Sequence, residues 1–334
     1  MKRSRYKAIG CFCLAVLLPS GWLLGATPEP PASESVMQVV DKVASWQIKT
    51  FDEAYRYRAV ARTNGSPPRQ YSTLVWQNAV LYTGMDRWRR AAADPEPYLK
   101  WLKKIGRNNY WDFGGKDSHS ADDYAVGLLY LRLYDEFGDD DMIKTLRRRL
   151  EWIMRNPSTG SLENRTGTDW MKRWGWCDAL FMAPPVWAGM ARVTGEKAYL
   201  EFLDREYHAT YDLLWDPEEN LFWRDSSFFL HRELNGKKLF WARGNGWVIA
   251  GLALMIPELP EQWEGRGFYI TLYRQLAARL IQCQRADGTW NMGLLGDEAA
   301  YPERETSGTA LITFGLTWGI NYGLLDRAAY EPAI

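Results

Sequence analysis

The spacing of apolar residues predicts helices in almost every segment of the chain. Apolar side chains recur at intervals of three and four residues with charged residues between them, as expected for a helix with one face against a core. The clearest examples are residues 128–137, 142–154, 199–215, 269–284 and 308–325. No convincing run of alternating apolar and polar residues marks a strand. We therefore predict an all-α protein.

A pair of helices recurs along the chain. An apolar helix rich in small residues ends near a glycine, and a more highly charged helix follows it. The turn glycines are Gly84, Gly138, Gly195 and Gly323, and a further turn fits near residues 257–261. Glycine often ends a helix in the left-handed conformation, and acidic residues favour the start of the next helix.

The difference in polarity within each pair predicts how the pairs are arranged. Apolar helices that form an inner ring, surrounded by charged helices, produce a single closed (α/α)6 barrel, also called a six-hairpin toroid. An open solenoid is the alternative, but its repeats follow a stricter and shorter period. We expect the barrel to occupy residues 38–334 as one domain.

The N-terminal residues are typical of a secretory signal peptide. A positively charged start precedes an apolar run that ends in small residues near Ala26, and the loop-like sequence TPEPPASES follows. We predict a signal peptide at residues 1–26 and a flexible segment at residues 27–37. A membrane anchor is the alternative, but no stop-transfer charge cluster follows the run. We expect the mature protein to be secreted or periplasmic and not to contact the membrane.

Charge and aromatic content narrow the class of partner. The chain has 41 basic and 41 acidic residues, so it has no excess positive charge for binding nucleic acid. It also has 18 Trp and 18 Tyr residues, and aromatic faces stack on the apolar faces of sugar rings. Large helical cores also use tryptophan, so this content favours a carbohydrate ligand without establishing one. We expect the protein to be a monomer.

Cysteine and histidine residues provide no framework for a disulfide-rich fold or a metal centre. Cys11 and Cys13 lie within the predicted signal peptide, so only Cys177 and Cys283 remain to form a single bridge. The three histidines lack the close spacing of zinc ligands. Nucleotide-binding and serine-hydrolase motifs are also missing from suitable contexts. We predict that the protein uses neither a metal nor a cofactor.

Residues that precede the apolar helices are expected to line one mouth of the barrel. Four such segments are polar, aromatic or rich in glycine. They are HSADDYAVG, KRWGWCDALF, FWARGNGWVIAGL and YPERETSGTALITF, at residues 119–127, 172–181, 240–252 and 301–314. Because the inner helices of such a barrel start at the same end, we expect these segments to form one site.

Asp178 is the first candidate for catalysis. Trp174, Trp176 and Cys177 precede it, and walls of this kind exclude water from a carboxyl group and raise its pKa. A carboxyl group with a raised pKa can act as a general acid near neutral pH. The alternative is that Asp178 is only the N-cap of the helix that follows.

A second carboxylate is available in the segment that holds His119, Asp122 and Asp123. Sugar chemistry that uses two carboxyl groups needs one such group to face Asp178 from a neighbouring inner helix. Two adjacent aspartates at a helix start can also be one cap and one first-turn charge favoured by the helix dipole. The residues alone leave both interpretations open.

The remaining two segments offer binding groups. Arg243 could hold a carboxylate and Trp247 could stack on a sugar ring, whereas the glycines beside Asn245 are equally consistent with a simple turn. Thr306 or Ser307 is expected to be the N-cap of the last apolar helix. Either hydroxyl could also contact a ligand.

Five motifs in this order resemble those of the unsaturated rhamnogalacturonyl hydrolases, glycoside hydrolase family 105, and of the related unsaturated glucuronyl hydrolases of family 88. They are HxADDYxVG, RWxWCDALFMAPP, FWARGNGWVIAGL, DGTW and ETSGTALITFGLTWGINxGLLD. The resemblance implies an (α/α)6 barrel that removes a terminal 4,5-unsaturated uronic acid, of the unsaturated galacturonyl type, from lyase-generated oligosaccharides. In these families an aspartic acid hydrates the C4=C5 double bond, and the product then expels the neighbouring sugar.

The resemblance also implies roles for particular residues. Asp178 corresponds to the general acid and base, and the second aspartate falls at either Asp122 or Asp123. Arg243 and Trp247 match residues that contact the substrate.

One position departs from the family pattern. Several members have a histidine shortly after the segment NLF, where this chain has Arg224 and Asp225. Arg173, Arg224 and Arg243 are the candidate cations for an anionic substrate. The full set of candidate substrate-binding residues is Arg243, Trp247, Trp176, Trp174, Asn245, His119, Arg224, Thr306 and Ser307.

Two other functions stand as alternatives. An inverting glycosidase acting on a saturated sugar would use Asp178 with Asp122 or Asp123, at a carboxyl separation of about 6.5 to 9.5 Å. A noncatalytic periplasmic protein would bind sugars through the same tryptophan and arginine side chains. The sequence does not identify the sugar that follows the uronic acid.

Overall fold

A computed structural model of the chain describes residues 33–53, 72–114, 119–164 and 169–334. The predicted signal peptide, residues 1–26, lies outside these ranges. Helix α1 (Ser33–Thr50) begins within the segment predicted to be flexible, residues 27–37. Glu34 lies in its first turn, where the helix dipole favours a negative charge. The first helix therefore starts earlier than the sequence pattern predicted.

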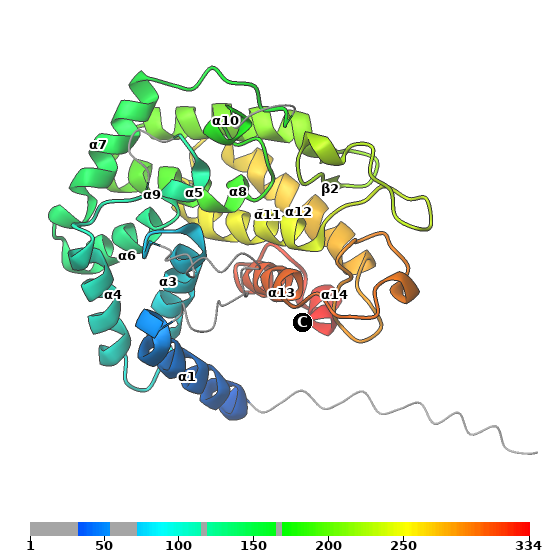
Figure 1. The fold of residues 1–334 in the computed structure, drawn as a ribbon, viewed down its shortest axis with the longest axis horizontal. Coiled ribbons are helices and arrows are strands. Elements are labelled where there is room, and N and C mark those ends of the chain that lie inside the picture. Colours follow the sequence, from blue (N-terminus) through cyan, green and yellow to red (C-terminus); the bar gives the residue numbers. More distant parts are fainter. Residues whose placement is uncertain (1–32, 54–71, 115–118, 165–168) are drawn as a thin grey trace, which may run out of the picture.

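The long helices alternate along the chain between an inner and an outer layer. The inner helices are α3 (Trp76–Arg89), α6 (Gly127–Phe137), α9 (Pro184–Thr194), α11 (Ala242–Met255) and α13 (Thr306–Asn321). The outer helices are α1, α4 (Glu96–Asn108), α7 (Asp141–Arg155), α10 (Ala198–Leu214) and α12 (Arg266–Gln282). Figure 1 shows α4, α7 and α10 following one another around the outside of the molecule.

The burial of each helix explains its layer. Every residue of α11 except Arg243 is buried, whereas α7 buries a single stripe at helical spacing, consisting of Met142, Ile143, Leu146, Leu150 and Ile153. A helix that is apolar on all sides belongs inside a core, and a helix with one apolar stripe belongs at the surface. The prediction of an all-α protein with apolar inner helices is confirmed.

Aromatic contacts connect inner helices that are distant in the sequence. Trp76 of α3 packs edge-on against Trp247 of α11, with ring centroids 5.9 Å apart. The guanidinium group of Arg87, also on α3, lies 5.0 Å from the ring centroid of Phe314 on α13. These contacts join the first described inner helix to the last two, so the described inner helices surround a common centre.

Short elements occupy the connections. They are helices α5 (Ala121–Tyr124), α8 (Ala179–Met182) and α14 (Arg327–Tyr330), and strands β1 (Trp215–Asp216) and β2 (Leu221–Phe222), which pair antiparallel. Single 3₁₀ turns span Phe51–Glu53, Asp169–Lys172, Ser226–Phe228, Ile256–Glu258, Glu298–Ala300 and Glu331–Ala333.

Three of the four predicted turn glycines adopt the left-handed conformation. Gly138, Gly195 and Gly323 have φ values of 65°, 71° and 76°, which a side chain would disfavour. The turn predicted at Gly84 is wrong, because α3 continues through this residue to Arg89. The continuation of the helix contains the buried ion pair between Asp86 and Arg89, 2.8 Å long, and pairs at this spacing stabilise a helix.

A continuous apolar core fills the described part of the molecule, and many of the tryptophans belong to it. Trp174, Trp187 and Trp290 are among its largest fully buried side chains. The bridge considered between Cys177 and Cys283 is not formed, since both thiols are free. Of the helices in the described ranges, none combines the length and hydropathy needed to cross a membrane.

Candidate active site

Asp122 and Asp178 lie on two short helices, α5 and α8, that pack against each other. Asp122 is the second residue of α5, and Asp178 immediately precedes α8. Asp178 occupies the N-cap position, but its side chain makes no capping hydrogen bond. The carboxylate of Asp178 is therefore not used in capping, which was the alternative interpretation of this residue.

A proline pair separates α8 from the inner helix that follows. The residues after Met182 are Ala183, Pro184 and Pro185, and α9 begins at Pro184. Proline has no backbone N–H and clashes with the preceding turn, so it fits the first turn of a helix and not the interior. The single helix predicted after Asp178 is thus two helices, and Asp178 belongs to the shorter one.

Burial raises the pKa of Asp178 to about 6. The Cys177 thiol, which donates a hydrogen bond to Asp178 Oδ1 at 3.4 Å, opposes this increase, as do the positive charges of Arg224 and Arg243. The desolvation predicted from the sequence is therefore present, and two nearby cations limit it.

Burial, followed by the negative charges of Asp178 and Asp123, raises the pKa of Asp122 to about 7. Two carboxyl groups that interact and are shielded from water do not both ionise at neutral pH. The Asp122–Asp178 pair therefore retains a proton near pH 7, as a general acid requires.

The structure distinguishes the two adjacent aspartates. The charge of Asp178 acts on Asp122, whereas Asp123 Oδ1 lies 3.1 Å from the position that a Cβ would take at Gly114. The backbone of Gly114 thus accommodates the Asp123 carboxylate in a narrow space. Asp122 is the better partner for Asp178.

Arg243, the only residue of α11 that is not buried, extends over the indole ring of Trp241. Its guanidinium carbon lies 4.0 Å from the ring centroid. Arg243 also donates to Ser307 Oγ at 3.4 Å and lies 3.7 Å from Glu305 Oε1. These weak polar contacts leave a partly exposed cation beside the carboxylate pair.

Arg224 approaches the same indole, with its guanidinium carbon 5.7 Å from the Trp241 centroid. It forms an ion pair of 2.5 Å with Asp225, whose side chain is fully buried. The backbone N–H of Cys177 donates to the Arg224 carbonyl at 2.9 Å. The segment that replaces the family histidine is therefore attached directly to the segment that holds Asp178.

Glycine allows α11 to approach the carboxylate pair. A Cβ at Gly244 would lie 2.7 Å from Cys177 Sγ, far inside ordinary contact distance. A larger residue would push the thiol away from Asp178. The glycines of this segment are needed for close packing and do not form a turn, because Ala242–Met255 is one continuous helix.

Trp176 and Trp247 remain close to the site but expose little surface, 6% and 5% respectively. Trp176 packs edge-on against Trp170 at 5.4 Å, and Trp247 packs against Phe181 at 4.8 Å. The indole N–H of Trp247 is buried and has no hydrogen-bond partner among the described residues. Each ring therefore has little surface with which to contact a ligand.

Three predicted binding residues have structural roles in the described fold. Asn245 has no exposed surface, and its side-chain amide exchanges hydrogen bonds of 2.8 and 3.0 Å with the backbone of Phe222. Trp174 is 2% exposed and packs against Phe202. His119 Nε2 lies 2.7 Å from the backbone oxygen of Asn156. These contacts hold loops in position. Asn245 has no surface left to contact a substrate, whereas a binding role of His119 and Trp174 stays a prediction.

Two other expectations require correction. Arg173 pairs at 2.9 Å with Glu206, which is 7% exposed, so it is not a free cation for a substrate. The N-cap of α13 is Glu305, which accepts a hydrogen bond from the Gly308 N–H, and not Thr306 or Ser307. Ser307 instead donates to Glu305, and Thr306 is exposed. A glutamate is an uncommon N-cap, which is why the pattern suggested the neighbouring hydroxyls.

Sequence reasoning missed Trp241 as a site residue. It precedes α11, and both candidate cations, Arg224 and Arg243, lie over its ring. The signal was present, since an aromatic residue next to Arg243 at a helix start can stack on a guanidinium group.

A separate cavity of about 310 Å³ lies along α6, from Leu128 to Asp135, and against the C-terminal parts of α3 and α11. None of the site residues Asp122, Asp178, Arg224 and Arg243 lines it. It therefore does not belong to the carboxylate site. Within the described ranges, no three His, Cys, Asp or Glu side chains gather as a metal centre would require.

The profile of Glycosyl Hydrolase Family 88 matches residues 39–334, almost the whole predicted barrel domain. Two relatives are named unsaturated 3S-rhamnoglycuronyl hydrolase. The one from Alteromonas sp. (strain LOR) is 33% identical over 309 residues, covering 89% of this chain and 73% of the relative. The one from Formosa agariphila is 33% identical over 342 residues, covering 98% and 85%.

Solved structures agree with this match. A family 88 glycosyl hydrolase from Bacteroides vulgatus superposes with a TM-score of 0.70 at 29% identity, covering 87% of this chain and 82% of that one. A structure described as a polysaccharide lyase gives 0.71 at 30% identity, covering 87% and 81%. The predicted (α/α)6 barrel and the resemblance to these related families are confirmed. The chain is a glycoside hydrolase and belongs to glycosyl hydrolase family 88.

Proposed function

We propose that this enzyme removes a terminal 4,5-unsaturated uronic acid from oligosaccharides by adding water across the C4=C5 double bond. The observation that carries the proposal is the Asp122–Asp178 pair, whose raised pKa values of about 7 and 6 keep a proton available near neutral pH. Protonation of an enol-ether carbon needs a carboxyl group in this state. The names of the relatives from Alteromonas and Formosa support the substrate class.

Asp178 acts first as an acid and then as a base. Its proton is transferred to C4, and the electron pair of the double bond forms the new C–H bond. The positive charge that develops at C5 and the ring oxygen is removed when water adds at C5 and gives a proton to the Asp178 carboxylate. The resulting hemiketal opens, and the bond to the neighbouring sugar breaks.

Asp122 supports this cycle from α5. The negative charge of Asp178 raises the pKa of Asp122, so Asp122 holds the proton when Asp178 is ionised. In that state Asp122 donates a hydrogen bond to the incoming water or to the sugar ring. The assignment of Asp122 in place of Asp123 rests on this electrostatic contact.

Arg243 and Arg224 bind the carboxylate of the uronic acid. Both guanidinium groups reach the indole of Trp241, at 4.0 and 5.7 Å, and both act electrostatically on Asp178. A guanidinium group binds a carboxylate through two parallel hydrogen bonds, which also fixes the orientation of the sugar. Arg243 makes the weaker contacts within the protein and is therefore the principal anchor.

The sugar next to the uronic acid is rhamnose in this proposal, in line with the names of the two relatives at 33% identity. Degradation of polysaccharides is consistent with the predicted location outside the cytoplasm. We also propose that the enzyme acts as a monomer. Galacturonyl and glucuronyl precursors give the same unsaturated residue, because C4 has no configuration once the C4=C5 bond has formed. The assay below therefore distinguishes substrates by the sugar that follows this residue.

The test is a panel of lyase-generated oligosaccharides from pectin, rhamnogalacturonan, ulvan and glycosaminoglycans, followed by loss of the ultraviolet absorbance of the double bond. We expect rapid loss with a rhamnose-linked substrate and release of a rhamnose-terminated product by mass spectrometry. Hydrolysis of saturated nitrophenyl glycosides without loss of absorbance would instead identify an ordinary inverting glycosidase. Increased absorbance on intact polysaccharide would identify a lyase, and binding without turnover would identify a carrier protein.

A further inference from the structure

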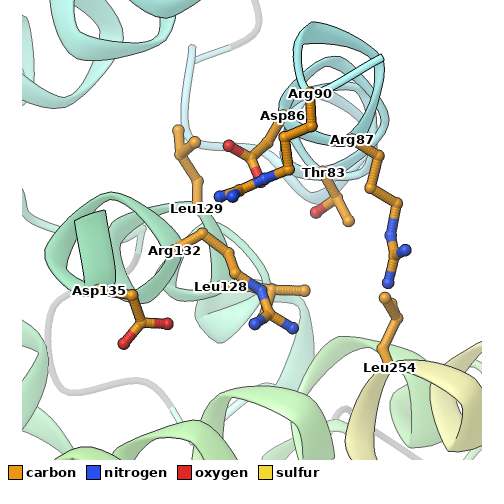
Figure 2. A pocket seen from close by; sticks show the side chains of 9 residues that line it. All are labelled: Thr83, Asp86, Arg87, Arg90, Leu128, Leu129, Arg132, Asp135 and Leu254. Carbon is orange, nitrogen blue, oxygen red and sulfur yellow. The ribbon is translucent and has the colours of Figure 1, made fainter. Parts of the chain in front are cut away.

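The cavity of about 310 Å³ between α3, α6 and α11 is lined by charged groups from inner helices. Figure 2 shows the guanidinium groups of Arg87, Arg90 and Arg132 arranged around it, with Leu128 and Leu254 on the wall. Arg87 and Arg90 come from α3, Arg132 comes from α6, and Leu254 comes from α11. Three inner helices therefore meet at a space with three cationic groups.

Most of these cations are paired with carboxylates. Arg132 binds Glu258 at 2.6 Å, and Glu258 also binds Arg192 at 2.6 Å. Arg192 in turn binds Asp135 at 2.7 Å. Glu258 is only 4% exposed, so two guanidinium groups are needed to compensate its buried charge.

A second set of ion pairs lies on the α3 side. Asp86 binds Arg89 at 2.8 Å and Arg90 at 3.3 Å, and Glu136 binds Arg89 at 2.5 Å. The two sets together contain five guanidinium groups and four carboxylates, namely Arg87, Arg89, Arg90, Arg132 and Arg192 with Asp86, Asp135, Glu136 and Glu258. Of these five cations, Arg87 has no ion pair with any carboxylate of the described residues.

The surroundings of Arg87 reflect this excess of positive charge. The Arg87 side chain is exposed at the mouth of the cavity, yet the atoms packed around its guanidinium group, followed by repulsion from Arg132, lower its pKa below the usual value. Asp86 and Glu258 counteract this decrease only in part. Its contact with the Phe314 ring, at 5.0 Å, does not supply a negative charge.

We propose that this cavity binds a tetrahedral oxyanion, such as a sulfate or phosphate group, between Arg87 and Arg132. The cluster has one more guanidinium group than carboxylates, and its guanidinium groups converge beside an apolar wall. This arrangement favours an anion with several acceptor oxygens. The volume exceeds that of a free sulfate ion, so the group is either an inorganic anion with water or an ester on a sugar. The bound anion would link α3 to α6 and stabilise the barrel at a site that shares no lining residue with the carboxylate pair.

Negative helix ends offer a competing explanation for the arginines. The C-terminal parts of α3 and α11 border this cavity, and helix C-termini stabilise cations without any ligand. The two explanations differ in one respect. Only the proposed site makes the stability of the protein respond to an oxyanion through Arg87.

The test compares thermal unfolding of wild type, Arg87→Gln and Arg148→Gln in millimolar sodium sulfate, sodium phosphate or sodium chloride at equal ionic strength. Arg148 is exposed on the outer helix α7 and is the matched control for loss of one positive charge. Sulfate at ten times Kd is expected to raise Tm by about 3 °C in wild type and in Arg148→Gln. Arg87→Gln is expected to lose this response. Because sulfate also stabilises proteins without binding to a site, the difference between the two variants is the decisive quantity.

Equal responses in the two variants would overturn the proposal, and so would an absence of binding heat when sulfate or phosphate is titrated into wild type in a calorimeter. The calorimetric measurement needs no variant, so misfolding of Arg87→Gln would not remove the test. Titration of a sulfated monosaccharide beside its uncharged parent sugar identifies the source of the anion. Turnover of unsaturated oligosaccharides by Arg87→Gln is expected to be unchanged, so this proposal and the proposed function fail independently.

Discussion

The thiol of Cys177 donates a hydrogen bond to the carboxylate of Asp178, with 3.4 Å between Sγ and Oδ1. The donor favours the charged form of Asp178 and lowers its pKa, and the same contact raises the pKa of the thiol. Cys177 is buried, and burial is the largest cause of its raised pKa, so it is unsuited to be a nucleophile. Its role is to adjust the proton affinity of its neighbour.

Cys177→Ala is therefore expected to move the alkaline limb of the kcat/KM profile to higher pH. In wild type that limb should fall between about pH 6 and pH 7, because the pair must hold a proton to act as an acid. Removing the thiol raises the pKa of Asp178, so the protonated form persists to higher pH. Cys177→Ser keeps a donor and is the control. A limb that stays in place in Cys177→Ala would contradict the role given to this contact.

Asp178→Asn is expected to bind substrate normally and to lose at least about a hundredfold in turnover, the usual effect of removing a general acid. The amide has nearly the shape of the carboxylic acid but cannot transfer the proton to C4. The measurement is the rate of loss of ultraviolet absorbance, with substrate affinity measured separately by calorimetry. A near wild-type rate would exclude Asp178 as the acid.

Asp122→Asn is expected to stabilise the protein at pH 8 more than at pH 4. The pKa of Asp122 is raised to about 7 in the folded state, so between about pH 4 and pH 7 the folded protein binds more protons than the unfolded chain. Stability from this group therefore falls as pH rises through that range. The amide that replaces the carboxyl group does not ionise, so the variant avoids this loss of stability. We expect the gain in the free energy of unfolding to exceed about 1 kcal/mol at pH 8. Chemical denaturation at both pH values tests the prediction, and equal effects at both would contradict it.

Arg243→Gln is expected to raise KM for an unsaturated uronic acid by about tenfold or more, the usual cost of losing a charged hydrogen bond. Arg148→Gln again removes an exposed charge and serves as the control. The wild-type KM is also expected to rise with salt, because part of the attraction is electrostatic. A lower kcat with unchanged KM would mean that Arg243 acts only through the pKa of Asp178.

Gly244→Ala and Gly84→Ala form a matched pair with opposite expected effects. A methyl group at Gly244 would lie 2.7 Å from Cys177 Sγ, whereas nothing lies within 4 Å of one at Gly84. We expect Gly244→Ala to lose about 1–3 kcal/mol of stability by overpacking and to reduce activity. Gly84→Ala is expected to gain about 0.5–1 kcal/mol, because alanine favours a helix interior. Thermal unfolding and assay of both variants check this contrast.

The fold was predictable because helical periodicity and polarity are local properties of the chain. The apolar segment that became α11 is buried at every residue except Arg243, and Gly138 and Gly195 end their helices as predicted. Gly84 was misread because α3 continues beyond it, through the ion pair of Asp86 and Arg89. Asp86 and Arg89 lie three positions apart on α3, so this pair is local, and the tertiary contact is that of Arg89 with Glu136 on α6. The glycine that suggested a turn gives no sign of either contact.

The site was predictable only in part, because a motif does not say which way a side chain points. Asn245 lies within the same motif as Arg243, yet its amide is fully used by the backbone of Phe222. Asp122 and Asp123 are indistinguishable in the sequence, and only packing separates the one near Asp178 from the one against Gly114. The residue types in the motifs predicted the chemistry of the site. The orientation of each side chain could be known only from the fold.

Pro184 has no backbone N–H to donate to the carbonyl of Leu180, four residues earlier. That oxygen lies against Gly251 of α11, where a Cβ would overlap it. The break that shortens α8 and the missing side chain on α11 are therefore structurally coupled. Lineages that keep the proline are expected to keep the glycine, and a larger residue at position 251 should arise only after the proline is lost. If positions 184 and 251 vary together among related sequences, the short helix that follows Asp178 has been kept by both residues.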